Sequence, residues 1–297
     1  MLTIVTTPRP LTDKFQLDLC NAVGSWKCLQ PRPQVLVFGG RRQFVHSIGA
    51  THIARFPHSK QGLPYLDSYV SIAQRIAKHN IIMLTSDHLI LLSDFMSSLK
   101  KVSQRFPGAF AMIGQRWDTD VTEPIDFRNP KWESKLTSLR GRYRGHAAKD
   151  WFVFRLPLNF DLLPFVIGRR GWDTWFTHAL LTSDIPVVDV TCRATTIHPT
   201  HDYAHVKGGV CRENSTDPGT LHNLRVYRGA IPHPKHISDA TWGLTCDGTF
   251  LHGQDWTQWK FDKEREWEIG FEQHRRRLLP GLHRPDYCGW RCKWMPK

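Results

Sequence analysis

Apolar residues over the first 120 positions of this 297-residue chain follow two alternating spacings. Short runs rich in β-branched residues are typical of strands, and the segments between them repeat apolar residues every three or four positions, as helices do. The expected strands are Leu2–Thr6, Val35–Phe38, His52–Phe56, Ile81–Thr85 and Ala109–Ile113. The expected helices span about 15–26, 65–77 and 93–106. This β-α-β order predicts a parallel sheet with right-handed crossovers.

The pattern weakens in the second half of the chain. Residues 117–145 are rich in Asp, Pro, Arg and Gly and favour loops, and the chain after His205 is again loop-rich. Further strands are expected at Trp151–Phe154, Val187–Val190 and Ala194–Ile197. Further helices are expected near Trp132–Leu139, from Gly171 to about Leu181, and near Glu264–Leu279.

The predicted elements favour one α/β domain over residues 1–210, with a mostly parallel central sheet flanked by helices. Residues 211–297 are expected to form a loop-rich extension packed on the same domain. A chain of this length, with 40% apolar and 23% charged residues, can bury a sizeable core. It contains no apolar run long enough to span a bilayer.

The cysteine count indicates the cellular compartment of the protein, and the net charge indicates the kind of partner it binds. Seven cysteines, an odd number, argue for a reducing compartment rather than a disulfide framework, and the N-terminus lacks the pattern of a secretory signal. We therefore expect a soluble, cytoplasmic protein. The formal net charge of +13 favours anionic partners such as phosphorylated small molecules or nucleic acid, although a solvated basic face explains it equally well.

Polar residues directly after the expected strands are the first candidates for chemistry, because ligands of open α/β sheets bind beyond the carboxyl ends of the strands. Asp87 follows the continuous apolar strand Ile81–Thr85, where it is poorly placed for packing. Magnesium and manganese prefer oxygen ligands shared with substrate phosphates, and His88 can add an imidazole. The alternative is that Asp87 caps a turn.

Other candidates occupy similar positions. His198 follows a late strand and can complete a metal site begun by Asp87, and Asp150 lies at a strand entrance where it can bind sugar hydroxyls. Arg41, after the second strand, can neutralise phosphates. Asp118-Thr119-Asp120 is a literal D-x-D, which leaves open a metal site, a contact to substrate hydroxyls or a loop cap.

The segment Gly171–Trp175 places Asp173 between two tryptophans at an expected helix start. Trp172 offers an aromatic face on which a sugar can stack, and Asp173 can act as the general base that deprotonates an acceptor hydroxyl. The alternative is an acid favoured by the helix dipole beside tryptophans of the core.

Six segments, in this order along residues 1–210, together resemble glycosyltransferases of the GT-A type, including members from plants, algae, bacteria and large algal viruses. They are Thr3–Pro8, Met83–Leu92, Gly114–Asp118, Asp150–Phe154, Gly171–Asp173 and Ile197–His198. The resemblance implies a GT-A-like nucleotide-sugar-binding catalytic domain. It also implies a UDP- or GDP-sugar donor, a divalent metal (Mn²⁺ or Mg²⁺) and transfer to a hydroxyl of a glycan or glycoprotein. Residues 211–297 would then bind the acceptor or form a lid.

The resemblance also implies roles for individual residues. Thr6, Thr7 and Pro8 would line the nucleotide base, and Asp87 would be the metal acid. Asp150 would contact the donor or acceptor sugar, Asp173 would be the base of an inverting reaction, and His198 would be a further metal contact. Ser86-Asp87-His88 departs from a full D-x-D, which leaves open a metal-independent variant in which basic residues stabilise the diphosphate.

Two other classes of function stay open. Asp126 followed by Glu133-Ser134-Lys135 imitates the acids and lysine of a metal-dependent nuclease, and the chain is basic. A non-catalytic binder of glycans or nucleic acid would also use aromatics and cations. Nucleic acid is not the expected partner. The chain has no Gly-x-x-x-x-Gly-Lys-Ser/Thr, Gly-x-Gly-x-x-Gly or Gly-x-Ser-x-Gly motif, so nothing favours a P-loop protein, a dinucleotide-binding enzyme or an α/β-hydrolase.

Overall fold

The computed structural model describes residues 1–10, 12–139, 141–143, 148–201, 216–228 and 234–262. The chain divides into two compact units, Met1–Gly253 and Gln254–Lys297. The helix expected near Glu264–Leu279 and the residue His205 lie outside the described residues. The elements below all belong to the first unit.

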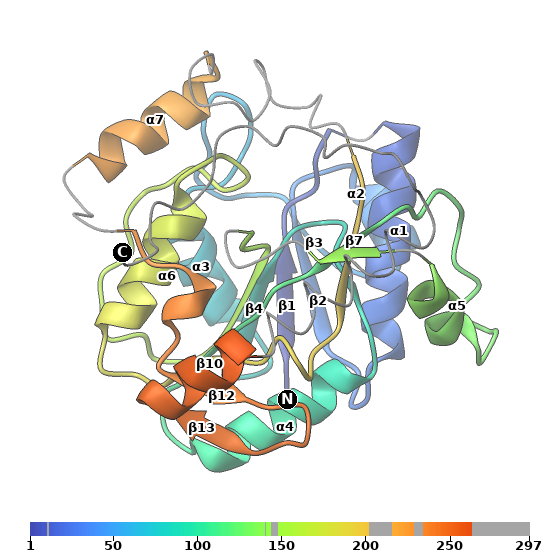
Figure 1. Cartoon of the computed structure of the whole chain (residues 1–297). Helices are drawn as coiled ribbons and strands as arrows, with labels where there is room; N and C mark the ends of the chain where they lie inside the picture. The colour runs from blue at the N-terminus through green and yellow to red at the C-terminus, as the bar shows by residue number, and fades with distance from the viewer. Residues whose placement is uncertain (11, 140, 144–147, 202–215, 229–233, 263–297) are drawn as a thin grey trace, which may run out of the picture. The chain divides into compact units, whose positions relative to one another are not determined.

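A nine-stranded sheet forms the centre of the first unit (Figure 1). In spatial order its strands are β13 (Phe250–His252), β12 (Trp242–Leu244), β10 (Val187–Asp189), β6 (Ala111–Ile113), β9 (Trp151–Arg155), β4 (Ile81–Thr85), β1 (Thr3–Thr6), β2 (Gln34–Phe38) and β3 (Thr51–Ile53). Strands β9 and β13 run antiparallel to their neighbours, and the other pairs are parallel. The predicted mostly parallel sheet is therefore confirmed.

Helices cover both faces of this sheet, and the strands alternate their side chains between the two layers. Helices α1 (Asp13–Cys28) and α4 (Asp94–Arg105) share one core cluster with Ile81 and Met83. Helices α3 (Leu66–Ile76) and α6 (Trp172–Thr182) share the other with Ile82 and Leu84. Both faces of β4 are thus buried, as its continuous apolar run predicts. Figure 1 shows α3 and α6 on one side of β1 and β4, with α1 on the other.

The described residues also form a second, four-stranded sheet. Its strands, in spatial order, are β5 (Ile90–Leu91), β11 (Thr196–Pro199), β7 (Trp117–Thr119) and β8 (Gly141–Tyr143). It shares a small core with helix α5 (Trp132–Ser138), to which Ile90, Trp132 and Ile197 contribute. Strands β7 and β8 lie in the stretch 117–145 that was expected to form loops, and β5 was not predicted at all, because two or three residues are too few for a strand period to show.

The expectation of loops after His205 needs correction. Helix α7 (Pro218–Tyr227) begins with Asp217, whose carboxylate accepts a hydrogen bond from Thr220 N, and with proline in the first turn. Strands β12 and β13 add to the main sheet, so part of the region 211–297 belongs to it.

Two further short helices are α2 (Arg42–Ser47) and η2 (Ile237–Asp239). Among the described residues, no helix has the length and hydrophobicity to cross a bilayer.

Candidate functional site

One edge of the main sheet gathers most of the predicted site residues. The parallel strands β1, β4 and β6 end at this edge, and β9 begins there because it runs antiparallel to β4 and β6. The backbone N–H of Ser86, just after β4, donates to the carbonyl oxygen of Asp150, just before β9, at 3.0 Å. Asp87 and Asp150 are therefore brought to the same edge although 63 positions separate them in the sequence.

Arg9, just after β1, links two buried carboxylates. Its backbone N–H and its Nε donate to the two oxygens of Asp87, at 2.7 and 2.8 Å, and its Nη2 donates to Asp18 Oδ2 at 2.9 Å. Asp87 Oδ1 also lies 2.9 Å from Nδ1 of His88. We refer to Arg9, Asp18, Asp87 and His88 as the Arg9 cluster. Both oxygens of Asp87 thus contact the protein, and the carboxylate supports Arg9 and His88.

Arg116, just after β6, makes a second arrangement of the same kind. Its Nε donates to Asp118 Oδ1 at 2.8 Å, and its Nη1 contacts Asp150 Oδ2. Asp118 Oδ1 lies 3.4 Å from Nδ1 of His198, the residue beside it in the parallel pairing of β7 with β11. We refer to Arg116, Asp118, Asp150 and His198 as the Arg116 cluster. The literal D-x-D thus contributes its first acid to this edge.

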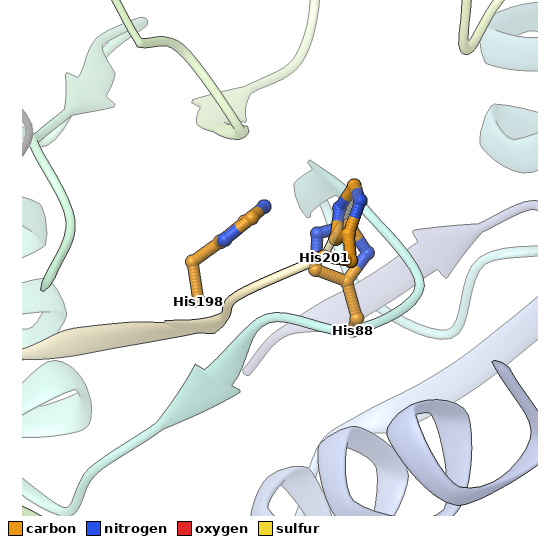
Figure 2. A group of neighbouring side chains, drawn as sticks. All are labelled: His88, His198 and His201. Carbon is orange, nitrogen blue, oxygen red and sulfur yellow. The ribbon is translucent and has the colours of Figure 1, made fainter. Parts of the chain in front are cut away.

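Three histidines lie where the two clusters meet. Strand β11 pairs antiparallel with β5, which begins two residues after His88, and this register brings His198 beside His88. His201 follows β11 by two residues and completes the group. Their ring centroids are 4.3 to 5.1 Å apart, and one nitrogen of each ring lies within 4.8 Å of the other two. Figure 2 shows the three rings grouped together.

The spacing of the three histidines and the protonation state of His198 fit a metal ion. In a tetrahedral zinc site with Zn–N bonds of about 2.0–2.1 Å, the ligand nitrogens are about 3.3 Å apart, so the rings need to close by at most about 1.5 Å. Burial lowers the pKa of His198 well below its usual range, and the nearby His88 and Arg116 lower it further. His198 is therefore neutral at pH 7, which is the form that binds metals.

The charges around the histidines are not balanced. The Arg9 and Arg116 clusters together contain two arginines and four carboxylates, all of them buried or nearly so. Counted over these described side chains alone, with the carboxylates ionised and the histidines neutral, the two clusters sum to two negative charges. Burial raises the pKa of Asp150 and of Asp18, while the paired arginines act in the opposite direction. A divalent cation would neutralise the excess where the dielectric is low.

Asp173 and Lys149 continue the edge toward helix α6. Lys149 is buried, and its Nζ lies 3.5 Å from Thr174 Oγ1 and 3.4 Å from His236 Nδ1. Burial lowers the pKa of Lys149, and the charge of Asp173 opposes that shift. The charge of Asp173 also helps to raise the pKa of Asp150. The half-buried Asp173 therefore lies close enough to both residues to act on them electrostatically.

The remaining predicted residues take different positions. Thr6 is buried, and its hydroxyl donates to the carbonyl oxygen of Thr85 at 3.0 Å, while the hydroxyl of the half-buried Thr7 donates to Phe38 O at 3.0 Å. Pro8 is half-buried between Thr7 and Arg9. Arg41 is exposed before α2. Trp172 packs edge-on against Phe152, with ring centroids 5.6 Å apart.

The acids of the nuclease alternative make local contacts. Both oxygens of Glu133 accept hydrogen bonds from Ser93, one from its backbone N–H at 2.9 Å and one from its hydroxyl at 2.8 Å, next to the start of α4. Asp126 is exposed and accepts a hydrogen bond from the backbone N–H of Arg128 at 3.1 Å. These contacts explain both carboxylates without a metal ion.

The sequence patterns missed Arg9, Asp18 and Arg116 and did not single out His201 as a ligand. Asp18 carries a signal that could have been used, because it lies on the apolar face of α1 beside Leu19. An acid on such a face is rarely buried without a cationic partner. The position of Arg116 directly after a strand is a weaker signal. The partners themselves depend on how the strands are ordered.

Comparisons with known proteins assign no family to the chain. No family model matches it, and no curated protein matches it in sequence. Among solved structures, one match is a CMP:2-keto-3-deoxy-manno-octonic acid synthetase complexed with CTP, with 12% sequence identity and a TM-score of 0.31. The match covers 52% of this chain and 73% of the synthetase. A likeness this weak establishes neither a family nor an activity.

Proposed function

We propose that this protein is a GT-A type glycosyltransferase that moves a sugar from a nucleotide-diphospho-sugar to an acceptor hydroxyl. The observation that supports the proposal most is the convergence of the three histidines, the two arginine clusters and Asp173 at the carboxyl edge of a mostly parallel sheet. Ligands of open α/β proteins bind at this edge. The same edge combines groups for a metal–diphosphate with a carboxylate for an acceptor.

Donor binding depends on a divalent metal in this proposal. The excess of negative charge at the two clusters would repel a diphosphate, and both arginines are already engaged by carboxylates. A bound divalent cation supplies the positive charge that neutralises the diphosphate and stabilises it as a leaving group. The charges of the two clusters therefore favour the metal-dependent variant of this proposal.

Asp173 is the general base of the transfer. Its carboxylate takes the proton of the acceptor hydroxyl while the acceptor oxygen bonds to the anomeric carbon of the donor sugar. The bond from that carbon to the diphosphate oxygen breaks, and the nucleoside diphosphate leaves. Asp173 lies half-buried in the first turn of α6, where an acceptor hydroxyl can reach its carboxylate. Attack from the face opposite the leaving group inverts the anomeric centre.

The donor occupies the space between the ends of β1 and β2 and the start of α6. Thr7 and Pro8 line the nucleotide base, and Trp172 offers an aromatic face to the sugar. Asp150, at the entrance of β9, accepts a hydrogen bond from a sugar hydroxyl, and Arg41 meets the phosphates from the exposed start of α2. The donor is a UDP- or GDP-sugar, and the acceptor is a glycan or glycoprotein.

The proposal is tested by calorimetry with UDP and GDP, each with and without a divalent metal. We expect saturable binding of one of them that is lost when the metal is removed by a chelator. A panel of UDP- and GDP-sugars then identifies the donor by release of the nucleoside diphosphate in the presence of candidate acceptors. If neither UDP nor GDP binds in any metal, the proposal fails.

A further inference from the structure

We propose that His88, His198 and His201 form a three-imidazole metal centre that selects zinc or a similar late first-row divalent ion over magnesium. This inference rests on the site of the proposed function and names its metal. It departs from the expectation of a carboxylate-held Mn²⁺ or Mg²⁺, in which Asp87 was the first ligand. Here the imidazoles bind the ion, Asp87 holds the imidazole of His88 by a hydrogen bond, and Asp118 lies beside that of His198.

The small sheet builds the centre from two segments. Strand β5 fixes the loop that carries His88, and β11 carries His198 and leads to His201. His88 and His198 are buried, so their positions are set by packing rather than by chance exposure. The candidate ligand atoms, one from each ring, already lie within 4.8 Å of one another. A metal ion requires donor atoms that converge in this way. Close packing of the chain does not by itself require three imidazoles to meet.

Each of the two buried histidines has a carboxylate behind it. Asp87 Oδ1 lies 2.9 Å from His88 Nδ1, and Asp118 Oδ1 lies 3.4 Å from His198 Nδ1. A carboxylate on one nitrogen fixes the tautomer and turns Nε2 into the metal ligand, and it also makes the imidazole more basic. The Arg9 cluster contains this carboxylate–histidine hydrogen bond, whereas in the Arg116 cluster Asp118 lies beside His198 Nδ1 without forming one.

The ligand set determines which ion binds. Imidazole nitrogen suits zinc, nickel, copper and iron, whereas magnesium prefers oxygen ligands and keeps much of its water. Three protein ligands leave one position of a tetrahedral ion for water or a substrate oxygen, as catalytic zinc sites do. The proposed donor offers a diphosphate oxygen for that position. The excess negative charge of the surrounding carboxylates favours any divalent ion, so the imidazoles supply the selectivity.

The test measures metal binding alone, with no nucleotide present. The full chain is stripped with a chelator and titrated with cobalt(II), which absorbs strongly in visible light when it is tetrahedral and weakly when it is octahedral. We expect one strong-absorbing cobalt site, displaced by one equivalent of zinc and unaffected by a large excess of magnesium. Replacing the half-buried His201 by Ala should lower the affinity for cobalt by at least tenfold, while His46→Ala, at an exposed histidine of α2, should not change it.

Two outcomes would contradict the proposed metal centre. One is a wild-type chain that shows no tetrahedral cobalt spectrum, or that binds magnesium as tightly as zinc. The other is unchanged cobalt affinity in both His201→Ala and a second variant, His88→Gln, with circular dichroism showing that each is folded. The experiments distinguish failure of the proposed metal centre from failure of the proposed function. Tight zinc binding without binding of UDP or GDP would refute only the glycosyltransferase, and magnesium-supported UDP or GDP binding in His201→Ala would refute only the centre.

Discussion

The Arg9 cluster and the Arg116 cluster have the same composition but different surroundings. In each, an arginine joins two aspartates, and one of these aspartates contacts a histidine of the metal centre. Asp18 and Asp87 are only 1% and 2% exposed, whereas Asp118 and Asp150 are each 15% exposed. The two arginines are about equally buried, so the difference lies in the acids: those of the Arg9 cluster are closed off inside the fold, and those of the Arg116 cluster are partly exposed.

This difference suggests that the two clusters have different roles. We call the Arg9 cluster the closed side, and the Arg116 cluster together with Asp173 the open side. A buried arginine with two carboxylates is weak support for stability in itself, but removing one partner leaves an uncompensated charge and is strongly destabilising. The Arg9 cluster therefore fixes the ends of β1 and β4 and the helix α1. The Arg116 cluster, with its partly exposed acids, is the side on which substrates can arrive. Substitutions on the two sides should affect different properties.

The largest expected effect is on the open side, at Asp173. Replacing it by Asn should lower the transfer rate by about 10²–10⁴-fold, because general bases contribute about that much. Donor affinity and thermal stability should stay close to those of the wild type, since the residue is half-buried and the amide is nearly isosteric. Initial rates with the identified donor, together with calorimetry, separate the two quantities. Asp161→Asn, at an exposed aspartate, is the matched control.

A loss of donor binding in Asp173→Asn, with the rate per bound donor unchanged, would reassign the residue from base to donor contact. It would also remove the functional contrast between the open side and the closed side, because Asp173 would then contribute to donor binding and not to the chemical step.

On the closed side, Arg9→Met should destabilise the fold by about 3–5 kcal/mol, because Asp18 and Asp87 would be left buried together without their cation. Urea unfolding followed by circular dichroism measures this change. Arg116→Met should cost clearly less, because water reaches Asp118 and Asp150 more easily. Arg128→Met is the control, since that guanidinium is 97% exposed. Equal losses for Arg9 and Arg116 would show that burial does not distinguish the clusters.

The sequence predicted the fold well where elements were long and apolar. The continuous run Ile81–Thr85 and the helical spacing of α1, α3 and α4 identified both faces of the main sheet. The direction of β9 was not predictable, because an isolated apolar run does not reveal which way the strand runs beside its neighbours. Yet that direction brings Asp150 to the edge of the sheet where β4 and β6 end. The second sheet was also missed, since β5 and β7 have two and three residues.

The sequence offered candidate residues for the site, and the structure shows which of them lie together, but the sequence did not reveal their pairings. Asp87, His88 and His198 were identified because each stands at or after a strand end. The hydrogen bonds of Asp87 to Arg9 depend on how the loop after β1 packs over the end of β4, and no spacing in the sequence contains that information. The same holds for Arg116, whose two acids come from β7 and from the start of β9.

A moderate effect is expected at Asp118, which supports His198 from the open side. Asp118→Asn should lower the affinity for cobalt by about 10–100-fold, because carboxylates behind metal-bound histidines contribute about that much. The fold should tolerate the change, since Arg116 keeps Asp150 as a partner. Cobalt titration measures the affinity, and Asp126→Asn, at an acid that is 63% exposed, is the control. Unchanged affinity would separate the Arg116 cluster from the metal centre.

The smallest expected effect distinguishes two roles for Thr6. Its hydroxyl donates to Thr85 O at 3.0 Å and so ties together the ends of the two strands that lead to Arg9 and Asp87. Thr6→Val should therefore cost about 1 kcal/mol of unfolding free energy, the usual net value of one hydrogen bond. Because the hydroxyl is buried and engaged, we expect no change in affinity for UDP or GDP. Weaker nucleotide binding at unchanged stability would instead place Thr6 in the base pocket with Thr7 and Pro8, and the closed side would then share in donor binding.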